Sequence, residues 1–355
     1  MSRSPTAVAT PTQTLDRLIE AARRDPKSSA LRHKHRGAWD AWSWRSLVAA
    51  VDRFASGLRR HGVEAGSVVA FAGEVSPNFL IGALATRAIG AAVISIAPGA
   101  GTAAIAAALR GLPVRLAVVQ GREALAEWIQ AGQAAATSIP IVFDHVTPEG
   151  RSPHPSVSPI ASLRDHAAEQ GWVETLGVSS SAPRRKSTLW VEATTTWPDG
   201  LDIITDLWLV TGETLALPEL LAASARDRFE IRPNRWIASS DRLIAATVEI
   251  TGRLPSGGGP AARFVAHAMG SSRSMSIAAP FVWGLLRYRL GLSRLNFVEV
   301  GDDHRRTKQG EEAGALFAAL GAPLRRIASE DFGAETTGSA PANAIGRLAL
   351  SGDAR

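Results

Sequence analysis

Three hydroxyl side chains stand together in a part of the sequence where they would suit a phosphate group. Thr194, Thr195 and Thr196 follow an apolar segment inside Val191–Gly200, whose sequence is VEATTTWPDG. Loops that hold phosphates combine hydroxyl groups with glycines, which allow close approach of the backbone, and with a lysine that neutralises charge. No glycine separates the threonines from Trp197. The stretch has one part of the chemistry of phosphate binding and lacks another.

Other short motifs contain the residue types of a binding site but not its spacing. Residues 99–104, GAGTAA, fit the G-x-G-x-x-A pattern of dinucleotide loops, but no acidic residue ends a strand about twenty residues later. Residues 211–214, TGET, lack the lysine and second glycine of a phosphate loop. Asp302 and Asp303 carry oxygen ligands for magnesium, yet two arginines follow closely, as is typical of a solvated loop. The histidines lack metal-ligand spacing. We predict no metal site.

The composition limits the class of protein. With 355 residues, 45% of them hydrophobic and 20% charged, the chain is long enough for a substantial core in one large or two ordinary domains. The absence of cysteine excludes disulfides and thiolate nucleophiles. The formal charge of +6 is spread along the chain without interleaved aromatic residues, so we expect no nucleic-acid partner. No apolar run predicts a signal peptide or a membrane span, which favours a cytoplasmic location.

Apolar strands alternate with amphipathic helices along most of the chain. This alternation predicts parallel sheets covered by helices on both faces, and therefore an α/β fold of two lobes. Strands are expected at 68–72, 92–96, 116–119, 140–143, 208–217, 235–238 and 296–300. Helices are expected at 43–62, 76–89, 103–109, 122–131, 160–170, 218–225, 241–253 and 311–320, with one or two more within 263–289.

Composition shifts predict the boundaries of the lobes. Residues 1–29 begin with a segment rich in Ser, Thr and Pro and are expected to be disordered or loosely ordered. The first lobe is placed at 30–175 and the second at 176–335, with a flexible C-terminus at 336–355.

Several segments together resemble a known family. The N-terminal ones are WSWRSL at 42–47, ASGL at 55–58, HGVEAGSVVA at 61–70 and AIGAA at 88–92. Parts of 208–239 and 286–324 agree as well. In order and spacing, these segments are similar to the large N-terminal domain of the AMP-forming acyl-CoA synthetases. The resemblance covers roughly residues 30–335 and implies that domain's fold. For an active member it also implies ATP, magnesium, coenzyme A and a carboxylic acid.

The chain departs from the family's motifs where nucleotide should bind. The family's phosphate loop, T-S-G-T-T-G-x-P-K-G, is expected between about residues 175 and 205, but VEATTTWPDG resembles the segment downstream of it, so the loop is predicted to be missing. The family's aromatic-G-x-T-E turn corresponds to Ile327–Asp331, where no aromatic residue is available to stack on adenine. The chain ends at Arg355, before the family's lysine-bearing C-terminal domain.

The resemblance and its departures imply a catalytically silent relative of these synthetases, to which we assign no catalytic residue. Residual cofactor binding would rest on Gly301, Glu330 and Asp331, with ATP, magnesium and coenzyme A bound only if some activity remains. We expect an accessory or regulatory partner of another protein, for example an intact synthetase. Two alternatives stay open: an active ligase completed by another chain, and a module that binds acyl groups or coenzyme A.

A missing loop should also leave an apolar groove between the lobes. We expect this groove between 179–197 and 286–303, with Trp190, Trp208 and Phe297 on its floor. Because exposed apolar surface is costly in water, a partner chain or an acyl ligand is expected to fill it.

Overall fold

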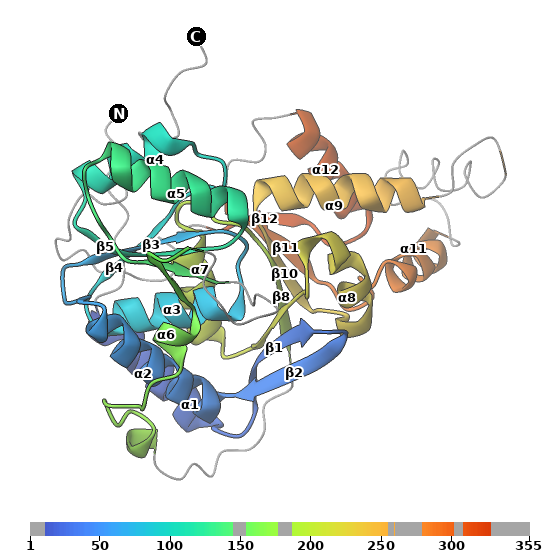
Figure 1. Ribbon diagram of the computed structural model, residues 1–355. Helices are drawn as coiled ribbons and strands as arrows, with labels where there is room; N and C mark the ends of the chain where they lie inside the picture. Colours follow the sequence, from blue (N-terminus) through green and yellow to red (C-terminus); the bar gives the residue numbers. More distant parts are fainter. Residues whose placement is uncertain are drawn as a thin grey trace, which may run out of the picture.

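Two mostly parallel sheets, each flanked by helices, make up the described part of the chain, which confirms the predicted α/β class (Figure 1). The computed structural model describes residues 11–144, 154–176, 187–254, 259, 279–301 and 308–327. One sheet has seven strands and the other has five. We call them sheet A and sheet B.

Sheet B belongs to the first lobe, and all of its strand pairs are parallel. Its strand order is β4-β3-β5-β6-β7. The strands are β3 (Val68–Ala72), β4 (Ala92–Ser95), β5 (Val114–Val119), β6 (Ile141–Phe143) and β7 (Val157–Pro159). The helices of this lobe are α2 (Trp44–Arg60), α3 (Pro77–Ala88), α4 (Thr102–Gly111), α5 (Arg122–Ala134) and the short α6 (Ala161–Arg164). Most of the elements expected between 43 and 143 are confirmed.

Sheet A has the strand order β12-β11-β10-β8-β9-β1-β2 and is parallel except for the hairpin at its edge. Its strands are β1 (Ser29–His35), β2 (Ala38–Ser43), β8 (Thr188–Glu192), β9 (Thr214–Leu217), β10 (Arg235–Ala238), β11 (Phe297–Val300) and β12 (Leu324–Arg326). Its helices are α7 (Gly200–Thr211), α8 (Ser224–Ile231), α9 (Ser240–Arg253), α11 (Ala279–Arg289) and α12 (Lys308–Ala319).

The side chains of the two sheets divide the core into layers. In β3, Val69 and Phe71 join the central cluster with α2 and α3, whereas Ala70 packs toward α4 and α5, as the period of two in a strand requires. Sheet A is covered on its other face by α9 and α12, where Trp236 contacts Phe317 edge-to-face at 5.5 Å. Helices α1 (Pro11–Arg24), α2, α3 and α7 thus lie in the layer between the sheets.

Three predictions about secondary structure were wrong. The helix expected at 218–225 is replaced by a single 3-10 turn at Leu221–Ala223 and by α8, which begins only at Ser224. Residues 208–217 were expected to form a strand, but α7 continues to Thr211 and β9 begins only at Thr214. Because α7 lies between two sheets, it is apolar on almost every side, and its sequence loses the helical period that would reveal it. The helix expected at 160–170 is limited to α6.

The N-terminal boundaries also differ from the prediction. Within residues 1–29, residues 11–24 form α1, because Leu15, Leu18 and Ala22 recur at helical spacing and pack on the central core. The β1–β2 hairpin was assigned to the first lobe, but β1 pairs with β9 of sheet A. Residues 1–10 and 336–355 lie outside the described part of the chain.

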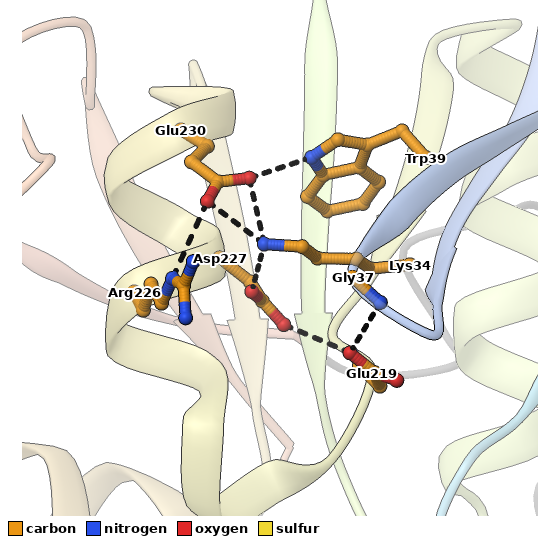
Figure 2. A network of polar contacts seen from close by, with 7 residues as sticks. All are labelled: Lys34, Gly37, Trp39, Glu219, Arg226, Asp227 and Glu230. Atoms are coloured by element: carbon orange, nitrogen blue, oxygen red, sulfur yellow. Dashed lines mark hydrogen bonds and ion pairs between the residues drawn. The ribbon is translucent and has the colours of Figure 1, made fainter.

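A buried lysine fastens this hairpin to α8 (Figure 2). The Nζ atom of Lys34 donates to Asp227 Oδ1 at 2.9 Å and to both carboxylate oxygens of Glu230 at 2.8 Å. Trp39 Nε1 donates to Glu230 at 2.9 Å, and the backbone nitrogen of Gly37 donates to Glu219 at 3.1 Å. The bonds to Glu230 and Asp227 hold the pKa of Lys34 above its ordinary value. Lys34 therefore stays protonated and holds the hairpin against α8, and it does not serve as a base or a nucleophile.

Candidate functional site at the β8–α7 connection

The stretch VEATTTWPDG forms the connection between a central strand and a helix. Strand β8 ends at Glu192, and α7 begins at Gly200. In the ladder, Glu192 pairs with Ala238 of β10, and Ala238 pairs with Val300 of β11. Strand order reverses here, because β9 lies on one side of β8 and β10 on the other. Such a switch point at the carboxyl ends of parallel strands is where α/β proteins commonly bind ligands.

This placement corrects the prediction that the phosphate loop is missing. Set without a gap on residues 191–200, the motif T-S-G-T-T-G-x-P-K-G matches at Thr194, Thr195, Pro198 and Gly200. The motif's two loop glycines fall on Ala193 and Thr196, its serine on Glu192 and its lysine on Asp199. The ungapped spacing of the four matching residues is the signal for this loop in the sequence. The loop is present, with its phosphate-binding residue types largely replaced.

The central hydroxyl of the loop is occupied by contacts within the protein. The backbone nitrogen of Gly73 donates to Thr195 Oγ1 at 2.9 Å, and this hydroxyl donates to the carbonyl of Ile96 at 2.6 Å. The backbone nitrogen of Thr195 donates to the carbonyl of Gly73 at 2.9 Å. Because its side chain is 1% exposed, Thr195 ties the loop to the ends of β3 and β4 and has no hydroxyl to offer a phosphate.

Neighbouring residues strengthen this attachment to the first lobe. Thr194 forms an isolated antiparallel bridge with Glu74, and the backbone nitrogen of Val75 donates to the carbonyl of Ala193 at 3.0 Å. The hydroxyls of Thr194 and Thr196 lie 2.6 Å apart. The loop thus serves as a connector between the edges of sheets A and B.

Trp197 fills the space between this loop and the end of β11. Its side chain is 2% exposed and belongs to the central core. A methyl group added at Gly301 would lie 1.7 Å from Cζ2 of the indole, and one added at Gly200 would lie 2.9 Å from Cδ2. Both glycines leave room for the ring. Gly301, predicted as part of a residual nucleotide turn, is covered by Trp197.

A buried carboxylate stands where the motif has serine. Glu192 has no exposed surface, and its Oε1 accepts from Trp190 Nε1 at 2.6 Å and from Arg228 Nη1 at 2.7 Å. Arg228 lies 4.3 Å from the ring centre of Trp236. Oε2 of Glu192 has no hydrogen-bond partner within the described residues, and Arg242 Nη2 lies 3.9 Å from it. The serine hydroxyl of the motif is thus replaced by a carboxylate that is already bonded to Trp190 and Arg228.

The aromatic residues predicted as a groove floor do not lie together. Trp190 packs between sheet A and its outer helices, whereas Trp208 packs on Trp44 in the central layer, with ring centres 5.5 Å apart. Both side chains are fully buried. Phe297 is half-buried at the start of β11, with Arg325 3.9 Å from its ring centre. These three side chains belong to separate surroundings and line no common groove.

Some predicted site residues are outside the description. Glu330 and Asp331 fall outside the described residues, as do Asp302, Asp303 and the segment 179–186. Across the described ranges, no group of three or more His, Cys, Asp or Glu side chains is arranged to hold a metal ion. None of the helices in the described part of the chain has both the length and the apolar character that crossing a bilayer requires.

Comparisons with solved structures identify the fold. The A domain of carboxylic acid reductase from Segniliparus rugosus, solved with AMP and a co-purified carboxylic acid, aligns with a TM-score of 0.59 and 14% identity over 90% of this chain and 62% of that chain. Acetoacetyl-CoA synthetase from Streptomyces lividans aligns with a TM-score of 0.56 and 16% identity over 88% and 50%. The fold is that of the N-terminal domain of adenylate-forming enzymes, and the chain spans 62% of the first of these two structures and 50% of the second.

The sequence agrees with this class. Residues 18–180 match the family model described as AMP-binding enzyme. This match covers the N-terminal segments that carry the resemblance drawn from the sequence, and it confirms that resemblance there. No curated protein matches the chain by sequence.

Proposed function

We propose that this protein is a non-catalytic member of the adenylate-forming family that acts by binding a partner protein. The observation that carries the proposal is the state of the β8–α7 connection. Its central hydroxyl, on Thr195, is bonded to Gly73 and Ile96, and the Trp197 ring covers Gly301. Adenylation relies on positioned groups that stabilise charge on the transferring phosphoryl group. The residues present here do not fit that task.

The electrostatics support the same proposal. The motif's lysine position is Asp199, and Glu192 adds a buried carboxylate below the loop. Asp199 places negative charge where an active enzyme needs a cation beside the phosphates, and Glu192 replaces a hydroxyl donor with a carboxylate already paired with Arg228. The residues of this connection therefore do not accommodate a nucleotide triphosphate, and we derive no catalytic step through one.

The test is adenylate formation by the purified protein. We expect neither acyl-AMP nor pyrophosphate above the no-protein level when the protein is given ATP, magnesium and a panel of carboxylic acids. An intact adenylate-forming enzyme is the positive control. Acyl-AMP formed by this chain alone would overturn the proposal.

A second experiment tests the alternative that this chain is part of a ligase completed by another chain. An intact synthetase is added, and product formation is compared between the wild type and Thr196→Val, which removes an exposed hydroxyl of the loop. If this chain supplies part of the active site, the substitution should reduce turnover. If the chain acts only as a partner, turnover should be the same with either protein.

A further inference from the structure

Helix α8 is anchored on the side that faces the protein. Asp227 and Glu230 bind Lys34 of the hairpin, and Arg228 donates to Glu192 at the end of β8. These contacts fix the rotation of the helix about its axis, and Figure 2 shows those to Lys34. Residues three apart share a helix face, so Arg226 and Phe229 stand on the side that faces solvent.

The solvent-facing side of α8 and part of α11 together form an exposed apolar surface. Phe229 is 38% exposed, Tyr288 47% and Leu285 50%. The rings of Phe229 and Tyr288 meet edge-to-face, with centres 6.3 Å apart and planes at 81°. We call these three residues, together with Arg232, the α8–α11 surface. Large apolar side chains gathered on a surface mark sites of association.

Arg232 supplies the charge of the α8–α11 surface. Its guanidinium carbon lies 4.3 Å from the ring centre of Tyr288 and 5.4 Å from that of Phe229. Its backbone has φ of 50°, in the left-handed region that a side chain disfavours. Within the described residues, Arg232 forms no ion pair with a carboxylate. Its cation is held by aromatic rings and remains available to an acid.

The junction below this surface is closely packed. Gly291 follows α11 with φ of +73°, and a methyl group there would lie 2.5 Å from the Cα of Phe229. The turn after α11 therefore lies directly on the backbone of α8. A surface fixed in this way loses little conformational entropy when a partner binds.

We propose that the α8–α11 surface binds an acidic segment of a partner protein, with a carboxylate on Arg232 and apolar side chains on Leu285 and on the exposed edge of Tyr288. Arginine and tyrosine are the residues that most often dominate protein interfaces. A nucleic-acid strand fits less well, because Arg232 already covers the ring of Tyr288 on which a base would stack. The inference extends the partner role proposed above and does not depend on the loss of nucleotide binding.

The experiment uses random peptides of about 12 residues displayed on phage and selected on the full-length protein. We expect the selected peptides to be rich in Asp and Glu alongside apolar residues. A selected peptide, labelled with fluorescein, should bind the wild type and lose about tenfold in affinity with Arg232→Gly or Tyr288→Ala, as for a central interface residue.

The matched control is Arg36→Gly. Arg36 also has φ of 50°, but it lies in the turn of the β1–β2 hairpin. Both arginine-to-glycine changes remove one charge and suit the left-handed backbone, so both proteins should fold. Arg36→Gly should leave peptide affinity unchanged.

Three results would overturn the inference: no enrichment of acidic peptides, equal binding by Arg232→Gly and the wild type, or binding of single-stranded RNA that Arg232→Gly abolishes in the absence of peptide binding. The adenylate assay is independent of all three. A failure here is therefore distinguishable from a failure of the non-catalytic proposal.

Discussion

The indole of Trp197 lies against the backbone of Gly301, so closely that a methyl group at residue 301 would be 1.7 Å from the ring. The contact joins the loop after β8 to the end of β11, two strands away in sheet A. Glycine is required at 301 by space alone, because its φ is not in the left-handed region. The ring and the glycine form a complementary pair that closes the carboxyl edge of the sheet.

Gly301→Ala should therefore destabilise the protein. The added methyl group forces the ring or the strand end to move, and overpacking of this kind costs about 1–3 kcal/mol. Urea unfolding followed by tryptophan fluorescence measures the change. The control is Gly252→Ala in α9, where nothing lies within 4 Å and alanine should stabilise by about 0.5–1 kcal/mol. Equal stability of the wild type and Gly301→Ala would show that the ring does not occupy this position.

The buried pair of Glu192 and Arg228 should be costly to break from one side. Arg228→Met leaves the carboxylate of Glu192 buried without its main partner, a loss of about 3–5 kcal/mol. Arg60→Met removes an exposed pair with Glu169, whose side chains are 59% and 43% exposed, and should cost much less stability because solvent screens the pair. Unfolding free energies of the two variants give the comparison. A small loss for Arg228→Met would mean that the network contributes little.

Because of Asp202 in α7, the stability of the folded protein should depend on pH. Burial raises its pKa to about 7, to which Asp206 and Asp199 add, while Arg87 opposes the shift. Because the folded state keeps this proton between about pH 4 and pH 7 and the unfolded state does not, stability should fall as pH rises through that range. The loss is at most about 4 kcal/mol.

Asp202→Asn tests this dependence. The variant should match the wild type near pH 4 and exceed it in thermal midpoint at pH 8. The difference in thermal midpoint between the two proteins at each pH separates the effect of Asp202 from that of other groups. One such group is His33, whose pKa is lowered by burial. A difference that stays constant from pH 4 to pH 8 would exclude a raised pKa at Asp202.

The sequence was most informative where each element has its own local signal. Ser76 followed by Pro77 predicts the start of α3, and the Ser76 hydroxyl indeed accepts from the backbone of Phe79 at 3.2 Å. In the same way, the apolar run Val68–Ala72 predicts β3 to the residue. These features depend on neighbours in the chain, so periodicity and capping rules find them.

The candidate site was harder to predict because it depends on distant residues. The position of Trp197 depends on its contact with Gly301, and that of Thr195 depends on its hydrogen bonds to Gly73 and Ile96. No local sequence pattern pairs these positions. The apolar sequence of α7 suggests a strand, and a strand there conceals the strand–loop–helix arrangement to which the preceding loop belongs. Only the spacing of four shared residues in VEATTTWPDG linked it to the phosphate-loop motif.

The central claim is that this connection no longer binds nucleotide, and calorimetric titration of the purified protein with ATP and magnesium tests it most directly. With Trp197 on Gly301 and the Thr195 hydroxyl engaged, ATP should bind no tighter than about 1 mM, or about 4 kcal/mol. An intact adenylate-forming enzyme, titrated under the same conditions, shows that the measurement detects binding. A dissociation constant in the low micromolar range would contradict the account.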